Sequence, residues 1–153
     1  RYAGLHTVSS HDGRTHDAIP VDSAAQIAQR VDPMAQVIAV DEVQFLDEGI
    51  VALATALAEK GRRVILAGVD TDFRGEPFGA MPQLLAVAES VTKLHAICLQ
   101  CGNPASRNQR LIDGRPARWD SPTIMVGAAQ SYEARCRACH EVIREDRAQV
   151  LLF

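Results

Sequence analysis

Residues 37–45 read Val37-Ile38-Ala39-Val40-Asp41-Glu42-Val43-Gln44-Phe45, an apolar run that ends in two adjacent carboxylates. A short apolar run of this kind is typical of a strand that is buried on both faces of a parallel sheet. In open α/β sheets, ligands bind just beyond the carboxyl ends of such strands. We therefore predict that Asp41 and Glu42 lie at the mouth of a ligand site, with their side chains on opposite sides of the strand.

The two carboxylates suit phosphoryl-transfer chemistry. An aspartate at the end of a hydrophobic strand holds Mg²⁺ in folds that hydrolyse nucleotides or transfer phosphoryl groups. A second carboxylate beside it can accept the proton of a hydroxyl nucleophile. The alternative is a strand that merely ends at a solvated polar edge, and this stretch alone leaves both interpretations open.

The segment that follows predicts a parallel crossover. Asp47 can cap a helix with an apolar stripe, and Gly61 can end that helix in the left-handed conformation. Residues 63–68 are then typical of a second buried strand. Strand, helix and strand together form the unit from which parallel sheets are built, so the fold class that we expect is α/β.

The remaining segments are less regular. Residues 1–20 are polar, and we expect a loop with one short strand there. Asp22 and Ser23 can cap a short helix. The other expected elements are helices over residues 24–30 and 82–90, a third strand over residues 91–97, and a hairpin between residues 109–112 and 123–126.

Size and charge narrow the class of protein. The chain has 153 residues, is 47% hydrophobic and 23% charged, and carries a formal net charge of −3. This composition is typical of a globular domain. The negative net charge does not indicate a surface that binds nucleic acid. Neither a membrane-spanning run nor a signal peptide is present in the sequence, so we expect a cytoplasmic protein. Because the chain begins at Arg1 and not at Met, we expect a fragment whose start is missing.

All four cysteines fall into two pairs, Cys98/Cys101 and Cys136/Cys139, and 34 residues separate the pairs. This spacing fits a four-thiolate zinc site, in which four sulfurs leave no open position and the metal is structural. Two disulfides or four unrelated thiols are the alternatives, and a cytosolic setting argues against disulfides. His140 could replace Cys139 as a ligand, although we favour a surface histidine.

Taken together, these features resemble the thymidine kinases of the zinc-containing, cellular and bacterial type. The matching motifs occur in the same order along almost the whole chain, and their ordered combination is specific. They are Arg1-Tyr2, Ser10-His11-Asp12, residues 41–45, residues 68–78 (Gly-Val-Asp-Thr-Asp-Phe-Arg-Gly-Glu-Pro-Phe), Ala88-Glu89-Ser90-Val91, Lys93-Leu94, the paired cysteines, and Val126-Gly127 followed by Tyr132.

The resemblance implies ATP-dependent phosphorylation of the 5′-hydroxyl of thymidine or deoxyuridine, in nucleotide salvage for DNA synthesis. It implies that Glu42 accepts the 5′-hydroxyl proton and that Asp41 helps to hold the magnesium of MgATP. Val43 and Gln44 would lie near the nucleotide phosphates, and Arg1 would face the transferring group. The implied cofactors are structural zinc, magnesium and ATP as phosphoryl donor.

The resemblance also implies a nucleoside pocket and a domain division. The substrate-binding positions that it implies are Phe45, Val69, Phe73, Phe78, Asn108, Thr123, Ile124, Met125, Val126, Gly127 and Tyr132. Thr123 to Gly127 would present backbone groups to the base as a lasso that the zinc site anchors at both ends. We thus expect an α/β nucleotide-binding domain over residues 1–97, incomplete at its start, and a zinc-binding lasso domain over residues 98–153. Asn108 stands where relatives often have threonine.

The family's phosphate loop, G-x-x-x-x-G-K-[ST], does not occur in this sequence, whose only lysines are Lys60 and Lys93. We expect it upstream of Arg1, as part of a phosphate-loop NTPase-like parallel sheet, and we expect a homotetramer. Two other interpretations stay open. One is a non-catalytic zinc-ribbon module that uses the arginines of residues 107–118 to bind nucleic acid. The other is a different phosphate-loop NTPase in which Glu42 activates water.

Overall fold

The computed structural model describes residues 7–9, 13–124 and 130–144. The chain forms two compact units, Arg1–Gly68 and Val69–Phe153, and each is described here by itself. The expected domain boundary near Ile97 stays a prediction. In the part of the chain that the structure describes, no helix has the length and apolar character needed to cross a bilayer.

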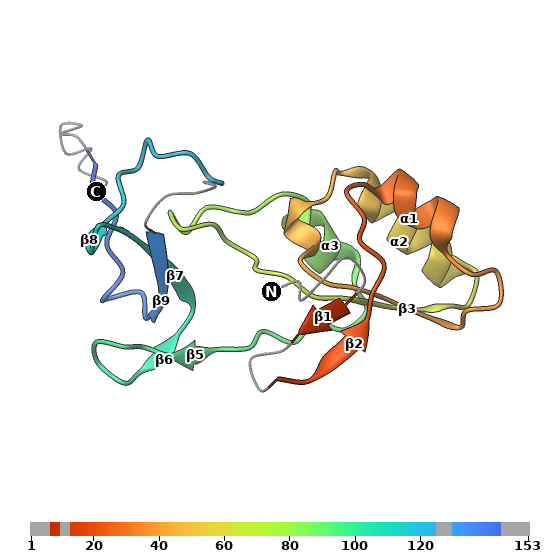
Figure 1. Ribbon diagram of the computed structural model, residues 1–153, viewed down its shortest axis with the longest axis horizontal. Helices are drawn as coiled ribbons and strands as arrows, with labels where there is room; N and C mark the ends of the chain where they lie inside the picture. The colour runs from red at the N-terminus through yellow and green to blue at the C-terminus, as the bar shows by residue number, and fades with distance from the viewer. Residues whose placement is uncertain (1–6, 10–12, 125–129, 145–153) are drawn as a thin grey trace. The chain divides into compact units, whose positions relative to one another are not determined.

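The first unit is a small mixed α/β assembly (Figure 1). It begins with a two-stranded antiparallel pair, in which Val8 lies opposite His16, so the expected loop in this region contains two short strands. The described elements are β1 (Thr7–Ser9), β2 (Thr15–Asp17), α1 (Ala24–Arg30), β3 (Val37–Val40), the short 3-10 helix η1 (Val43–Phe45), α2 (Gly49–Glu59) and β4 (Arg63–Leu66).

The predicted strand–helix–strand unit is confirmed. Strands β3 and β4 are parallel, and Val37 lies opposite Arg63 in the register. Gly61 follows α2 at φ +78°, the left-handed conformation that glycine adopts without steric cost. The helix begins one residue later than expected, with Glu48 at its N-cap, but the Asp47 carboxylate still accepts a hydrogen bond from the Gly49 N–H at 2.9 Å.

The same aspartate joins the two helices. Its second oxygen, Oδ2, accepts a hydrogen bond from the Ala24 N–H at 2.9 Å, so one carboxylate serves the first turns of α1 and α2. Helix α1 has the predicted range, and the Ser23 hydroxyl accepts from the Gln26 N–H at its start. Figure 1 shows α1 and α2 side by side along the β3–β4 pair.

Burial of the central strand on both faces was wrong for the described residues. Ile38 is buried, but Val37 is 54% exposed and Ile65 on β4 is 45% exposed. The reason is that β3 and β4 form a two-stranded sheet, and helix α2 packs against one of its faces. A larger parallel sheet of the phosphate-loop type therefore stays a prediction.

The described residues of the second unit, 69–124 and 130–144, form one helix and two antiparallel sheets. Its elements are α3 (Met81–Val87), β5 (Ala96–Ile97), β6 (Pro104–Ala105), β7 (Arg107–Ile112), β8 (Arg115–Pro116) and β9 (Gln130–Arg135). Strand β5 pairs with β6, and the three-stranded sheet has the order β8-β7-β9. The predicted helix over residues 82–90 is present but ends at Val87.

Two strand predictions in this unit were wrong. Of the expected third strand, residues 91–97, only β5 is extended and paired, and it pairs in the antiparallel direction with β6. Residues 109–112 pair with β8 and β9, whereas Thr123 and Ile124 lie outside every strand. The reason is local: Asp113 and Gly114 have φ of 50° and 75°, the conformation of a tight two-residue hairpin turn, which joins β7 to β8.

Candidate metal centre and active site

The four cysteines form one cluster in the second unit. Their sulfur atoms all lie within 4.8 Å of one another, and Cys101 Sγ lies 3.6 Å from Cys136 Sγ. A tetrahedral zinc–thiolate site with bonds of about 2.3 Å would place its sulfurs about 3.8 Å apart. Four soft ligands at this separation fit zinc, which Cys98, Cys101, Cys136 and Cys139 would hold as a closed structural site.

The backbone shapes both cysteine pairs as turns around the cluster. The Gly102 N–H donates to the Cys98 carbonyl at 2.9 Å, and Gly102 has φ +74°, which favours glycine at this position. In the second pair, the Cys139 N–H donates to the Cys136 carbonyl at 3.2 Å. The Leu99 N–H donates to the Ala134 carbonyl on β9 at 3.0 Å, which ties the first turn to the strand that leads to the second.

The thiols of this cluster do not titrate alike. Burial opposes ionisation of Cys98, but the backbone N–H groups of Cys136, Cys101 and Gln100 outweigh it and lower the pKa of the Cys98 thiol to about 6. The sulfur of Cys136 is the largest cause that raises the pKa of the Cys139 thiol to about 12. A hydrogen bond from the Cys139 backbone is the largest cause that lowers the pKa of the Cys136 thiol. The thiols therefore ionise unequally in the absence of a cation, and a divalent metal would stabilise all four as thiolates.

In the first unit, the chain turns sharply where β3 ends. Glu42 has φ 53° and ψ 36°, a left-handed conformation that is uncommon for a residue with a side chain. The strand therefore ends before Asp41 and Glu42, and the expected alternation of their side chains does not continue through them. Both carboxylates are exposed, and Asp41 Oδ1 accepts a hydrogen bond from the Glu42 N–H at 2.9 Å.

The residues that follow Glu42 hold this turn in place. The Val43 side chain is fully buried, and its N–H donates to the Ala67 carbonyl beyond β4 at 3.0 Å. The buried Gln44 side chain donates from Nε2 to Glu42 Oε2 at 2.5 Å, which orients the carboxylate. Phe45 is half exposed. The arrangement provides two accessible carboxylates on a rigid turn.

The second unit brings together several of the predicted nucleoside residues. Phe73 is 3% exposed, and the guanidinium groups of Arg74 and Arg110 lie 4.3 Å and 4.2 Å from its ring centroid. Arg110 also donates from Nε to the Tyr132 hydroxyl at 2.8 Å and from a terminal nitrogen to the Thr123 carbonyl. Phe73, Tyr132 and Thr123 thus meet around one arginine.

With this geometry described, the comparison with known families is informative: the family model for thymidine kinase matches residues 1–140. The chain belongs to the thymidine kinase family. The clustered cysteines fit the zinc-containing type of thymidine kinase. Membership supports a nucleoside kinase activity in general and implies nucleoside and ATP as substrates.

The other expected thymidine kinase residues occupy varied positions. Asn108 lies on β7 two residues before Arg110, so the two side chains lie on the same face of the sheet. Val69 is exposed, Phe78 is half-buried, and Thr123 and Ile124 are exposed. Arg1, Met125, Val126 and Gly127 lie outside the described residues. The individual roles of all these residues stay predictions.

Sequence reasoning missed the buried polar residues that organise the second unit. Asp72 is 7% exposed, and its Oδ1 accepts hydrogen bonds from the N–H groups of Arg74 and Glu76 at 2.8 Å and 3.1 Å. Gln109 is buried and makes a reciprocal pair of hydrogen bonds with the Glu141 backbone, both at 2.8 Å. The available signal for Asp72 was its place at the start of a tight turn that ends in glycine, where aspartate is favoured.

His140, expected at the surface, has a specific partner. It is only partly exposed, and its Nε2 lies 2.8 Å from the Phe73 carbonyl oxygen. A protonated Nε2 can donate to that oxygen, which makes His140 a link between the second cysteine pair and the Phe73 turn. It is not a member of the four-sulfur cluster.

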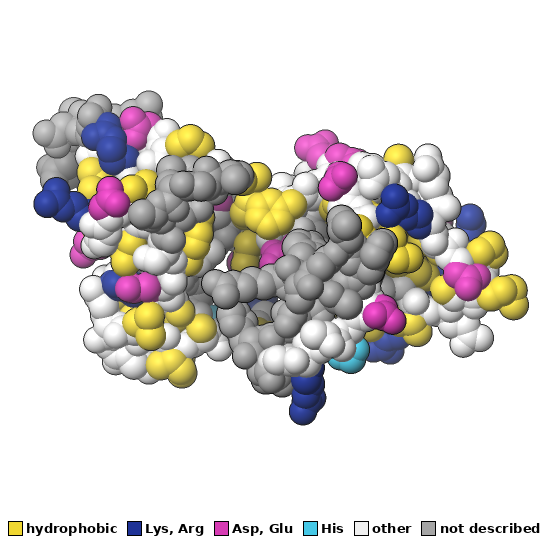
Figure 2. Space-filling view, in the orientation of Figure 1, with side chains coloured by type: hydrophobic (Ala, Val, Ile, Leu, Met, Phe, Trp, Pro, Cys, Tyr) yellow, Lys and Arg dark blue, Asp and Glu magenta, His cyan; other side chains and the backbone are white. Residues whose placement is uncertain are grey.

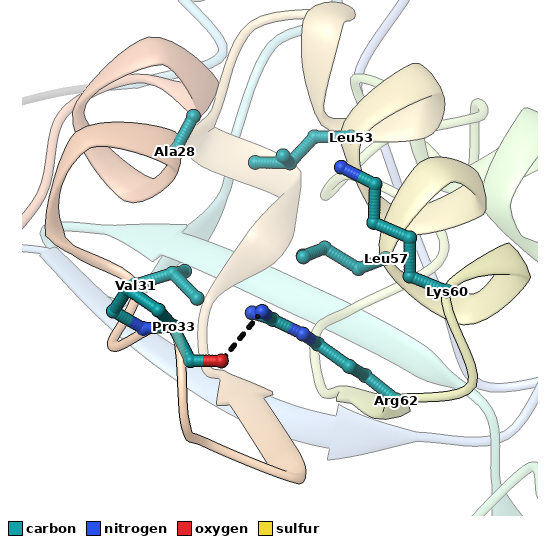
Figure 3. A pocket seen from close by; sticks show the side chains of 7 residues that line it. All are labelled: Ala28, Val31, Pro33, Leu53, Leu57, Lys60 and Arg62. Atoms are coloured by element: carbon teal, nitrogen blue, oxygen red, sulfur yellow. Dashed lines mark hydrogen bonds between the residues drawn. The ribbon is translucent and has the colours of Figure 1, made fainter.

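A cavity in the first unit, about 250 Å³ in volume, lies apart from the predicted site residues (Figure 3). Arg62 is one of the lining residues, and its guanidinium donates to the Pro33 carbonyl at 3.0 Å. The lining residues are Ala28, Val31, Pro33, Leu53, Leu57, Lys60 and Arg62. These side chains are mainly apolar with two cations, so this cavity offers no nucleophile or general base for phosphoryl transfer.

Proposed function

We propose that the protein is a thymidine kinase that transfers the γ-phosphoryl group of ATP to the 5′-hydroxyl of thymidine or deoxyuridine. In this reaction the 5′-oxygen attacks the γ-phosphorus, and the bond from that phosphorus to the β–γ bridging oxygen breaks. The products are the nucleoside 5′-monophosphate and ADP, and the hydroxyl proton passes to an enzymic base. The family match over residues 1–140 is the observation that carries this proposal.

Glu42 is the base in this proposal. Its carboxylate is exposed, and Gln44 fixes the orientation of that carboxylate through Oε2. A positioned carboxylate can accept the hydroxyl proton as the phosphoryl group is transferred. The rigid turn supports this role, because residues held in uncommon backbone conformations cluster at functional sites.

Asp41 would contribute to holding magnesium, and Val43, Gln44 and Arg1 would lie near the phosphates of ATP. Magnesium, when bound, neutralises the negative charge that develops on the phosphates. Asp41 is suited to this role since magnesium prefers carboxylate oxygens and Asp41 is exposed at the strand end. Zinc in the cysteine cluster would be structural, so it would act on nucleoside binding only through the fold.

The nucleoside would contact the aromatic and backbone groups that the family resemblance implies. Phe73 and Tyr132 support this assignment, because the two rings share Arg110 as a neighbour at 4.2 Å and 5.4 Å from their centroids. Phe45, Val69, Phe78, Asn108 and residues 123–127 complete the proposed contacts. We propose a cytoplasmic salvage enzyme that assembles as a homotetramer, and light scattering on the purified protein would test the assembly.

The test is a coupled assay of ADP release by the complete protein, loaded with zinc, with ATP and magnesium present. We expect ADP release that depends on thymidine or deoxyuridine, together with an equal amount of nucleoside 5′-monophosphate. ADP release without nucleoside would instead indicate an NTPase in which Glu42 activates water. Salt-sensitive binding of oligonucleotides without any kinase activity would indicate a zinc-ribbon module. On the face that Figure 2 shows, the basic and acidic side chains of the described residues are interspersed and form no basic stripe.

A further inference from the structure

Arg110 on β7 is a buried arginine whose hydrogen-bond partners are neutral oxygens. Its residue surface is only 1% exposed. Its guanidinium donates to the Tyr132 hydroxyl at 2.8 Å, to the Pro122 carbonyl at 2.5 Å and to the Thr123 carbonyl. Burying a guanidinium costs free energy unless its N–H groups are hydrogen-bonded. This position therefore requires arginine, whose planar group can donate to all three oxygens.

Arg74, in the turn of residues 72–75, donates hydrogen bonds to the segment 119–123, which also contains the two carbonyl partners of Arg110. It donates from Nε to the Trp119 carbonyl at 2.7 Å, from Nη1 to the Thr123 hydroxyl at 2.9 Å, and from Nη2 to the Ser121 carbonyl. The Asp72 carboxylate lies 2.6 Å from Arg74 Nη1 and holds the guanidinium in this orientation. Two arginines from distant parts of the sequence therefore converge on residues 119–123.

The guanidinium groups of Arg74 and Arg110 both lie over the Phe73 ring. The two groups lie 4.3 Å and 4.2 Å from its centroid, within the range of cation–π attraction. The Phe73 backbone is held in turn, because its carbonyl oxygen lies 2.8 Å from His140 Nε2. We name Phe73, Arg74 and Arg110 the arginine clamp.

We propose that the arginine clamp positions the segment 121–123 so that Thr123 and Tyr132 stand ready for the nucleoside. This inference rests on the proposed function, and it assigns Arg74 and Arg110 as positioning residues that act through the backbone they hold. Arg110 is the main one since it bonds to both Tyr132 and Thr123. The clamp should therefore set the affinity for nucleoside and not the affinity for ATP.

The alternative is that the arginine clamp only stabilises the fold of the second unit. A purely structural role predicts that loss of Arg110 lowers the unfolding temperature and reduces all activities together. A positioning role predicts a selective effect on thymidine. Lysine is the informative replacement, because it keeps the charge and most of the side-chain length but offers a single point of donation in place of the fork.

The experiment compares Arg110→Lys with Arg115→Lys in the complete, zinc-loaded protein. Arg115 lies on the neighbouring strand β8 with an exposed side chain, so it is a matched control for the same chemical change. The measurements are thymidine affinity by calorimetric titration, the KM values for thymidine and ATP, and amide hydrogen exchange of residues 119–124. Zinc content and unfolding temperature are recorded for each variant.

We expect Arg110→Lys to weaken thymidine binding about tenfold or more, since it loses charge-assisted hydrogen bonds to two carbonyls. The KM for thymidine should rise with little change in the KM for ATP, and exchange of residues 119–124 should become faster. Arg115→Lys should match the unmodified protein. If Arg110→Lys does not fold, Arg74→Lys, in which the Asp72 carboxylate still neutralises the charge, carries the same test.

Three negative outcomes are distinguishable. A folded Arg110→Lys variant with unchanged thymidine affinity would overturn the positioning role and leave the kinase proposal intact. An unmodified protein that neither binds nor phosphorylates thymidine would overturn the proposed function, and the clamp's role in nucleoside binding with it. Equal losses for thymidine and ATP would show that the clamp is structural only.

Discussion

The turn that follows β3 in the first unit differs from the arginine clamp and the cysteines of the second unit in how its polar groups are held. Asp41 and Glu42 are exposed and lie next to each other in the sequence, on a turn fixed by its immediate neighbours. The arginine clamp and the cysteines are assembled from segments tens of residues apart, and Phe73, Arg110 and Cys98 among them are buried. We therefore expect substitutions in the first region to change chemistry with little effect on the fold, and loss of the cysteines in the second region to remove structure.

Removal of the metal should give the largest effect and should fall on the second unit. Structural zinc contributes roughly 10 kcal/mol or more of apparent folding free energy in small zinc domains. We expect about one zinc ion per chain, and we expect Cys98→Ser or a strong chelator to abolish the cooperative unfolding transition of this unit. Metal analysis and circular dichroism would measure both effects. Ala138→Ser, at an exposed position between the second pair of cysteines, should keep metal and fold.

Glu42→Gln should separate chemistry from stability in the first unit. The substitution removes the proposed base but keeps an oxygen that can accept from Gln44, so the turn should persist. We expect kcat to fall by about 100- to 10,000-fold. The melting temperature should change little, because the side chain is exposed. Steady-state kinetics and calorimetry test this prediction, with the exposed Glu48→Gln as control. An active Glu42→Gln enzyme would remove Glu42 from the mechanism.

Gln109→Leu should show the converse behaviour in the second unit. The Gln109 amide exchanges hydrogen bonds with the Glu141 backbone, and leucine would leave the Glu141 N–H and C=O without these partners. We expect a loss of about 2 to 3 kcal/mol in the free energy of unfolding. Urea denaturation gives this value, and Gln83→Leu at an exposed position on α3 is the control. A neutral effect would mean that water replaces the lost amide.

Gly61→Ala should have the smallest effect of the four. Gly61 has φ +78°, and an added Cβ would meet no atom within 4 Å, so the cost arises from the backbone conformation alone. We expect a destabilisation of about 1 kcal/mol, seen as a lower urea midpoint. Gly61→Asn should recover part of it, because asparagine tolerates the left-handed region. Equal midpoints for all three proteins would show that the α2–β4 connection can shift at no cost.

The same contrast explains which features were predictable from sequence. The Ser23 cap, the glycine at the end of α2, the β3–β4 unit and the paired cysteines all depend on residues close together in the sequence. The prediction that both faces of β3 are buried was wrong because it assumes that other elements cover each face of the sheet. Which faces are covered depends on the tertiary structure and not on the strand's own sequence.

Long-range pairing was harder to predict. The β7–β9 register joins residues 107–112 to 130–135, and no local pattern specifies that partner. The turn between β7 and β8 was readable, because Asp-Gly between two strands is a strong hairpin signal, and it was missed. The role of Arg110 had no local signal, since a loop rich in arginine is usually solvated and its burial follows from the tertiary structure.

The left-handed backbone of Glu42 has a consequence for how this protein would evolve. A residue with a side chain costs of order 1 to 3 kcal/mol in such a conformation, and glycine would relieve that strain. Selection for thermostability alone should therefore drive this position toward glycine or asparagine, whereas selection for thymidine phosphorylation should restore glutamate, which we propose as the base. The two selections favour different residues at position 42. The residue found there in a laboratory population would therefore show which selection was stronger.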